Sequence, residues 1–282
     1  MSTRLNSLVA VVTGGAAGLG RAIATRLAAD GATVMITDIN RDLGTQVAAF
    51  NGWGFCEHDV CDESSWQGVL QTAQARLGSV HILVNNAGIL GPRDCANPVN
   101  TRLADWKRVM SVNVDGVFLG CKTMIPLMAQ SGGGTIINVA SIAGLRATPY
   151  ATAYGASKAA VRQLTKSVAQ HCALEDLRIR CNSVHPGDVA TAQWEEHVGH
   201  IAARDNIPLT EAIEDVRLSI PLRSITHPED VAAMVAFLAS EDAQQITGAM
   251  FVVDGGVANC ETYARAARSR APSLARDDDQ GS

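Results

Sequence analysis

Short apolar runs rich in valine and isoleucine recur along the chain, separated by longer amphipathic stretches. A run that is apolar throughout, rather than at every second position, is typical of a strand buried on both faces, as in a parallel sheet covered by helices. The amphipathic stretches have the spacing of helices with one apolar face. The pattern predicts strands at 8–15, 32–38, 81–88, 134–141, 179–187 and 249–256, and helices at 18–30, 62–77, 103–130, 153–173 and 227–239.

Strand and helix alternate from end to end, with no internal repeat and no interdomain linker. Such alternation favours an α/β fold: a doubly wound parallel sheet with right-handed crossovers and helices on both faces. We therefore predict a single Rossmann-type domain over residues 1–256. The last helix opens with Thr226 and Glu229 at the spacing of a capping box, and Pro228 falls in its first turn, where proline is tolerated.

Two segments depart from the alternation. Residues 188–225 form a long polar and helical excursion after the sixth strand, and insertions at the C-terminal ends of strands commonly carry substrate recognition. Residues 257–282 are rich in alanine and arginine and then acidic, which favours a flexible tail. The alternative is a tail that reaches a neighbouring subunit.

Composition narrows the class of protein. Apolar residues make up 47% and charged residues 18%, which suits a large core and not a disordered protein. A net charge of −5 offers no general attraction to nucleic acid or to an anionic membrane. No stretch approaches the ~20 apolar residues of a membrane-spanning helix, and we find no signal peptide. We expect a cytoplasmic protein that acts on a small molecule.

Neither the cysteines nor the histidines indicate a metal site. The seven cysteines form no Cys-x-x-Cys pair, as expected of reduced thiols in the cytoplasm. His197 and His200 stand three apart, but zinc needs three or four converging ligands and no partner cluster is evident. We expect a solvated helix face there, and no metal. His185, before a proline at a strand end, is expected to be packed or bonded to backbone, with a second proton carrier as the alternative.

A glycine-rich stretch, VVTGGAAGLGRAIATRLA, follows the first strand and opens the first helix. Gly14, Gly18 and Gly20 allow a tight turn, and free N–H groups at the helix start can face a pyrophosphate. The second strand ends at Asp38, 18 residues after Gly20, where a carboxylate accepts hydrogen bonds from the adenosine ribose. Because that carboxylate repels a 2′-phosphate, the sequence predicts NAD over NADP, with Arg41 near enough to keep the alternative open.

Eight motifs together resemble those of the short-chain dehydrogenase/reductase family. TGGAAGLG has the family's spacing Thr-Gly-x3-Gly-x-Gly, and the resemblance covers about residues 4–256. The departures are the longer tail and a small expansion, NPVNT, at 97–101. The other motifs follow in the family's order: HDV at 58–60, NNAG at 85–88, SVNVDG at 111–116, NVAS at 138–141, YGASK at 154–158, HPGDVAT at 185–191 and VDGG at 253–256.

The resemblance implies a role for each matching residue. It implies dimers or tetramers built on the helices at 103–130 and 153–173, and we expect an oligomer, with a tetramer favoured. The implied catalytic tetrad is Asn113, Ser141, Tyr154 and Lys158. The implied cofactor site consists of Gly14, Gly18, Leu19, Gly20, Asp38, Asp59, Val60, Asn86, Ala87, Gly88, Tyr154, Lys158, Pro186, Gly187, Val189 and Thr191.

Elementary chemistry leads to the same tyrosine and lysine. Tyr154 and Lys158 are four apart, hence neighbours on one helix face. A phenol with a pKa of about 10 is a poor base at neutral pH, and making it a thousandfold more acidic takes about 4 kcal/mol. A positive charge about 4 Å away in a partly shielded site supplies roughly that much. Ser141 would hydrogen-bond the substrate oxygen, and Asn113, by the resemblance, would hold a water that links Lys158 to solvent.

The expected substrate pocket is mostly apolar. Tyr150 stands eight residues before Lys158, about 12 Å along a helix. It is therefore too far away for the amine to tune it, and we expect it to line the pocket. For Trp194 two roles stay equally open: it forms the roof of the pocket, or it only packs against neighbouring side chains. The predicted pocket residues are Ile142, Leu145, Tyr150, Gln193 and Trp194.

These observations predict an NAD-dependent oxidoreductase that interconverts a secondary alcohol and a ketone, with Tyr154 as general base and acid. VNNAGIL, ASKAAV and IRCNSVHP are similar to stretches of bacterial hydroxysteroid and alicyclic-alcohol dehydrogenases, which favours a hydrophobic alicyclic or steroid-like alcohol. Three alternatives stay open: a reductase of acyl-carrier-linked ketones, a dihydrodiol dehydrogenase, and an NAD-sensing regulator that has lost catalysis.

Overall fold

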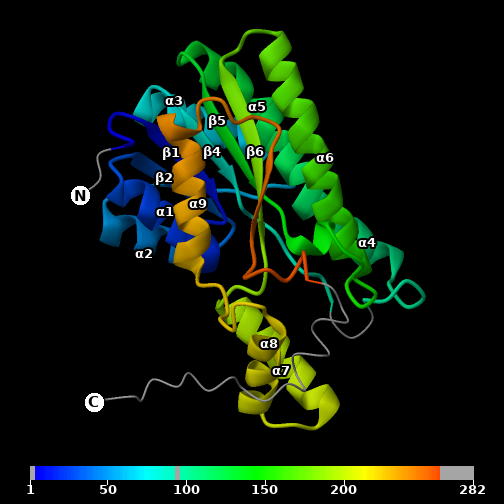
Figure 1. The fold of residues 1–282 in the computed structure, drawn as a ribbon. Helices are drawn as coiled ribbons and strands as arrows, with labels where there is room; N and C mark the ends of the chain where they lie inside the picture. The colour runs from blue at the N-terminus through cyan, green and yellow to red at the C-terminus, as the bar shows by residue number, and fades with distance from the viewer. Residues whose placement is uncertain (1–3, 93–95, 261–282) are drawn as a thin grey trace, which may run out of the picture.

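The strands lie side by side in one parallel sheet. A computed structural model describes residues 4–92 and 96–260, and within them the order is β3-β2-β1-β4-β5-β6-β7 (Figure 1). The strand order reverses between β1 and β4, so the C-terminal edge of the sheet opens a crevice at that point. The predicted doubly wound α/β fold is confirmed. The strands are β1 (Val9–Thr13), β2 (Thr33–Asp38), β3 (Gly54–Glu57), β4 (Ile82–Asn85), β5 (Gly134–Val139), β6 (Ile179–Pro186) and β7 (Met250–Val253).

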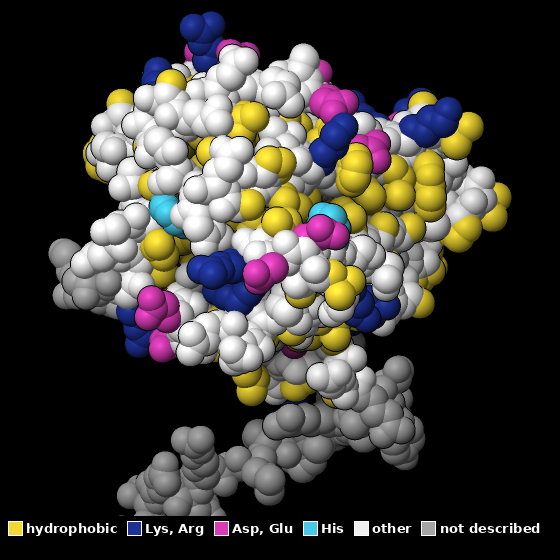
Figure 2. Space-filling view, turned by 90° about the horizontal axis from the view of Figure 1, so that it is seen from above, with side chains coloured by type: hydrophobic (Ala, Val, Ile, Leu, Met, Phe, Trp, Pro, Cys, Tyr) yellow, Lys and Arg dark blue, Asp and Glu magenta, His cyan; other side chains and the backbone are white. Residues whose placement is uncertain are grey.

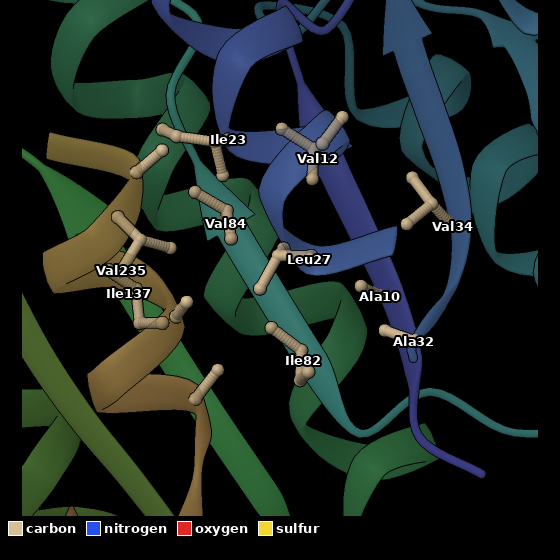
Figure 3. Packing of buried hydrophobic residues seen from close by; sticks show 14 of the residues in the cluster. Ala10, Val12, Ile23, Leu27, Ala32, Val34, Ile82, Val84, Ile137 and Val235 are labelled. Carbon is tan, nitrogen blue, oxygen red and sulfur yellow. The ribbon is translucent and has the colours of Figure 1, made fainter. Parts of the chain in front are cut away.

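Helices cover both faces of the sheet, which is why the strands read as continuous apolar runs. On one face, Ile23 and Leu27 of α1 and Val235 of α9 pack against strand residues such as Val12 and Val84 (Figure 3). On the other face a second cluster joins α3, α5 and α6 to the sheet. The helices on the first face are α1 (Gly18–Ala29), α2 (Arg41–Asn51) and α9 (Pro228–Ala239), and those on the second are α3 (Glu63–Leu77), α5 (Gly116–Gln130) and α6 (Thr152–Leu174).

Two elements were missing from the sequence prediction. Strand β3 pairs only with β2, and its residues are at most half-buried, so it lacks the apolar run of a central strand. Helix α2, RDLGTQVAAFN, has glycine and threonine in its interior. Its ends were nevertheless marked: the Asn40 side chain accepts a hydrogen bond from the Leu43 N–H, and Gly52 ends the helix at φ 71°.

The stretch predicted as one helix over 103–130 is interrupted by a π-helical turn. α4 (Leu103–Met110) leads into η1 (Ser111–Asp115) and then α5. Contrary to expectation, Leu103–Gln130 is long and apolar enough to cross a membrane: its most apolar 18-residue window has a mean hydropathy of 1.2. Its most apolar window is 56% buried, and α5 contacts β4, β5 and α3. These contacts are those of a core helix.

The cap of α9 differs from the predicted one. The helix begins at Pro228, as expected, but the Asp230 carboxylate accepts a hydrogen bond from the His227 N–H at 2.8 Å, so the box is one residue later than Thr226–Glu229. The reason is that Thr226 is extended and bridges Val189.

The excursion folds into two helices that extend beyond the C-terminal edge of the sheet (Figure 1). α7 (Ala192–Asp205) and α8 (Leu209–Ser219) pack on each other through Trp194, Val198 and Ala212. Three short elements remain: η2 (Ile142–Gly144), η3 (Glu241–Ala243) and the bridge at Val189. Val257 packs against Ile142 and Ile220, and residues 261–282 of the predicted tail lie outside the described residues.

Candidate active site

A cleft of about 1340 Å³ follows the C-terminal edge of the sheet from the glycine loop to α7. Of the predicted site residues, only Asn113 and Leu145 are not in its lining. Leu145 packs instead against Ile142, Ile220 and Val257, so its predicted place in the substrate pocket is wrong. The predicted residues that line the cleft are Gly14, Gly18, Leu19, Gly20, Asp38, Asp59, Val60, Asn86, Ala87, Gly88, Ser141, Ile142, Tyr150, Tyr154, Lys158, Pro186, Gly187, Val189, Thr191, Gln193 and Trp194.

The glycine loop needs its glycines for close approach. A Cβ on Gly20 would stand 2.0 Å from the Gly14 carbonyl oxygen, and Gly14 itself has φ 63°. The Asn86 amide donates to the carbonyls of Thr13 and Gly14 at 2.9 and 3.2 Å, which ties the loop to the end of β4. The loop and the start of α1 thus form a backbone cradle that fits a pyrophosphate.

Asp38 faces this loop from the end of β2. Its two carboxylate oxygens accept hydrogen bonds from the backbone N–H groups of Ala16 and Asn40, at 3.1 and 3.0 Å. Arg41 is directed to another acid: its guanidinium lies 3.9 Å from the exposed Glu57 carboxylate. The Asp38 carboxylate is therefore fixed in place, while the exposed Arg41 lies at ion-pair distance from another acid.

Tyr154, Ser141 and Lys158 come together where β5 ends and α6 begins. The Lys158 ammonium lies 5.6 Å from the centre of the Tyr154 ring and donates to the Val139 carbonyl at 2.9 Å. The Ser141 side chain lies close enough to Tyr154 to lower the pKa of the phenol, and its Oγ accepts a hydrogen bond from the Ala143 N–H at 3.1 Å. The predicted helix-face pairing of the tyrosine and the lysine is confirmed.

The protonation equilibria of this group differ from the sequence expectation. Burial raises the pKa of Tyr154, and the nearby Ser141 side chain offsets only part of this effect. Burial also lowers the pKa of Lys158 to about 8. A fully charged lysine beside a phenol would lower the pKa of the phenol. Here both groups are desolvated by burial, so the protein alone does not lower the pKa of the phenol.

Asn113 lies in the π turn behind the cleft wall, completely buried. Its side chain donates to the Ile89 carbonyl at 2.9 Å and to the Ser157 hydroxyl at 3.0 Å, and it accepts from the Ile89 N–H at 2.8 Å. A Cβ on Gly88 would lie 3.2 Å from the Asn113 Oδ1 and 3.4 Å from the Lys158 Nζ. Asn113 thus anchors the segment after β4 beside Lys158, and its side-chain hydrogen bonds are already in use.

Residues 14–258 match the protein family described as enoyl-(acyl carrier protein) reductase. The chain belongs to the short-chain dehydrogenase/reductase family. This family uses a nicotinamide cofactor, and the cradle, the fixed acid and the Tyr–Lys pair fit such a group.

Relatives of this chain are named as oxidoreductases of alcohols and steroids. The NADP-dependent (R)-specific alcohol dehydrogenase of Lentilactobacillus kefiri is 39% identical over 91% of this chain and 98% of its own. The 3-beta-hydroxysteroid dehydrogenase of Comamonas testosteroni is 36% identical, again over 91% and 98%. The cyclopentanol dehydrogenase of a Comamonas species is 39% identical over 90% and 98%. The crystal structure of levodione reductase superposes with a TM-score of 0.85, at 29% identity, over 92% of this chain and all of that one.

The sequence left the roles of His185 and Trp194 open. His185 is buried, its Nδ1 3.0 Å from the Ser141 carbonyl and its Nε2 2.9 Å from the Ser183 hydroxyl, so the expectation of a backbone-bonded histidine is confirmed. Burial lowers its pKa to about 4. Trp194 fulfils both roles: it lines the cleft and packs in the α7–α8 cluster, and its indole N–H donates to the Asp188 carboxylate at 3.2 Å.

Sequence reasoning missed several charged residues of the cleft. Asp188 follows Gly187, and three arginines line the cleft at positions 108, 146 and 204. They come from α4, the segment after η2, and α7, so only the tertiary structure brings them together. Among the described residues no group of three His, Cys, Asp or Glu side chains could hold a metal, and the six described cysteines are free thiols.

Proposed function

We propose that this protein is an NAD-dependent dehydrogenase that interconverts a secondary alcohol and a ketone. The proposal rests on one observation: Tyr154, with Ser141 and Lys158, shares a single cleft with the glycine loop and Asp38. A positioned acid–base group next to a nicotinamide site suits hydride transfer.

In the oxidation direction the Tyr154 phenolate takes the hydroxyl proton of the alcohol. The two electrons of the carbinol C–H bond leave as a hydride, and the carbon–oxygen double bond forms. The glycine loop and Asp38 would hold a nicotinamide cofactor, which in its oxidised form would supply the hydride acceptor and a positive charge. Ser141 donates a hydrogen bond to the substrate oxygen. Lys158, with a pKa of about 8, is largely an ammonium ion at neutral pH and stabilises the phenolate electrostatically.

For Asn113 the proposed role is positional. Its side chain holds Ile89 and Ser157, so a water that links Lys158 to solvent would be bound by the Asn113 backbone carbonyl. The π turn around it favours this, because a change from α to π bonding shifts carbonyls out of the regular ladder.

NAD is the proposed cofactor because the acid at the ribose end is fixed and Arg41 faces Glu57. We expect kcat/KM with NAD⁺ to exceed that with NADP⁺ at least tenfold. Asp38→Asn, which keeps the shape and removes the charge, should reduce this preference by about tenfold, since roughly 1.4 kcal/mol of repulsion is lost. Initial-rate kinetics with both cofactors check this, with Asp42→Asn as the control for an exposed acid nearby. Faster turnover of the wild type with NADP⁺ would contradict the proposal.

The proposed substrate is a hydrophobic alicyclic or steroid-like alcohol. Ile142, Tyr150 and Trp194 give the cleft apolar surface, and the relatives named for cyclopentanol and a hydroxysteroid act on such compounds. A dihydrodiol dehydrogenase or a 3-oxoacyl-type reductase remains the alternative within the same chemistry. The more distant alternative is a non-catalytic NAD-sensing protein, which would not need both Tyr154 and Lys158. If NAD⁺ raises the Tm but no alcohol from a panel of cyclic, aryl, dihydrodiol and steroid alcohols is oxidised, the sensor is favoured.

We also propose a cytoplasmic oligomer, a tetramer in preference, built on α5 and α6. Phe118 on α5 is 49% exposed, and Leu174 at the end of α6 is 82% exposed, so each of the two helices presents a large apolar side chain to solvent. Light scattering at micromolar concentration should give two or four times the chain mass of 29.6 kDa. Phe118→Asp should lower that mass, and a wild-type monomer would refute the assembly.

A further inference from the structure

Three arginines from separate elements line the cleft. Arg108 lies on α4, Arg146 in the segment after η2 and Arg204 on α7, and all three are exposed. The carboxylates in the described lining are Asp38 and Asp59, at the proposed cofactor end, and Asp188, which accepts the Trp194 indole hydrogen bond. The substrate end of the cleft thus carries more positive than negative side chains, in a chain whose net charge is −5.

Arg108 and Arg146 differ from Arg204 in their pairing. Arg204 is held by two hydrogen bonds to Asp205, at 2.7 and 2.8 Å. In the part of the chain that the structure describes, Arg108 and Arg146 make no hydrogen bond and no ion pair. Five N–H donors on each guanidinium therefore stay available to a ligand.

The acid that acts on Arg108 is hydrogen-bonded to another arginine. Asp105, the carboxylate whose pKa Arg108 helps to lower, already accepts two hydrogen bonds from Arg102, at 2.6 and 2.9 Å. Away from the cleft the charges are arranged differently. On the face opposite α7 and α8, lysine and arginine side chains are interspersed with aspartate and glutamate (Figure 2).

The arginines share one cleft with Tyr154. Arg146 follows Ser141 by five residues, and Tyr150, four residues after Arg146, lines the same cleft. A substrate held at Tyr154 can therefore extend along the cleft toward the arginines.

We propose that Arg108 and Arg146 bind a carboxylate or sulfonate on the substrate, so that the secondary alcohol oxidised at Tyr154 is an anionic one. The inference rests on the proposed dehydrogenase function and makes its substrate class more specific. The apolar skeleton would contact Ile142 and Trp194, and the guanidiniums would hold the anion with paired N–H donors, the geometry for which arginine is suited.

Two probes of equal size isolate the charge: 4-hydroxycyclohexanecarboxylate and 4-hydroxycyclohexanecarboxamide. Calorimetry on the enzyme saturated with NADH, which cannot oxidise them, should show that the carboxylate binds at least tenfold more tightly than the amide. The difference should shrink as salt is added, because the arginines are exposed. A carboxylate that binds no more tightly than the amide, including no measurable binding of either, would overturn the proposal.

Arginine variants test whether Arg108 and Arg146 cause the tighter binding of the carboxylate. Arg146→Met and Arg108→Met should each reduce the carboxylate advantage at least threefold, and the double variant should abolish it, with amide binding changed less than twofold. Arg76→Met, an exposed arginine on α3 outside the cleft, should leave the advantage intact. An advantage that survives in the double variant would also overturn the proposal.

Turnover measurements distinguish a wrong arginine site from a wrong dehydrogenase function. With NAD⁺, the anion effect should appear in KM and not in kcat, since binding far from the reacting carbon stabilises substrate and transition state alike. If the amide is oxidised and the carboxylate has no advantage, the arginine site is wrong and the dehydrogenase stands. If the carboxylate binds through the arginines but no NADH forms with any alcohol, the proposed dehydrogenase function is wrong.

Discussion

Replacing Tyr154 by phenylalanine should lower kcat for alcohol oxidation about a thousandfold or more and leave the Kd for NAD⁺ within about twofold. A positioned general base contributes factors of a hundred to ten thousand. The substitution removes only the phenol oxygen and keeps the ring beside Lys158. NADH formation from a panel of cyclic, aryl, dihydrodiol and steroid alcohols gives kcat, and fluorescence titration gives the Kd.

The cleft offers a matched control for this variant. Tyr150 lines the same cavity four residues earlier, but it is 74% exposed and precedes the first residue of α6. Tyr150→Phe should therefore retain kcat within about threefold. Turnover of Tyr154→Phe within tenfold of the wild type would refute the proposed base, whatever the control shows.

Acid should destabilise the protein through two buried histidines. Burial lowers the pKa of His58 and of His185 to about 4, whereas an unfolded histidine titrates near 6.5. Between these values the unfolded chain binds more protons than the folded one, so stability is highest above about pH 6.5 and falls as the pH drops toward 4. Each histidine should cost about 2 kcal/mol of unfolding free energy at pH 5.

Denaturant unfolding at pH 7 and pH 5 measures this loss. His185→Gln keeps a polar side chain near Ser141 and Ser183 but does not titrate, so it should remove about half of the difference between the two pH values. Because the measurement is a difference, a variant that is less stable at both pH values still tests the prediction. His171→Gln, at an exposed position on α6, is the control and should keep the full difference. An unchanged difference in His185→Gln would show that the acid sensitivity has another source.

Most of the fold could be predicted from local patterns of apolar and polar residues. Parallel strands covered on both faces are apolar throughout, so β1, β4 and β5 could be predicted from short windows. The edge strand β3 could not, because pairing on one side only leaves its residues half-buried and without a distinctive pattern. The cap of α9 lies one residue later than predicted because Thr226 pairs with Val189, a contact between positions 37 apart in sequence.

The sequence by itself determined the strand and helix alternation, the glycine loop with its acid 18 residues on, and the tyrosine and lysine one helical turn apart. These features depend on neighbours along the chain, through backbone sterics and helix periodicity. Only the tertiary structure decided that burial raises the pKa of Tyr154, that Leu145 turns away from the cleft, and that Arg108 and Arg146 line it. Desolvation, side-chain direction and charge clustering depend on which distant elements pack together, and no local window of residues contains that information.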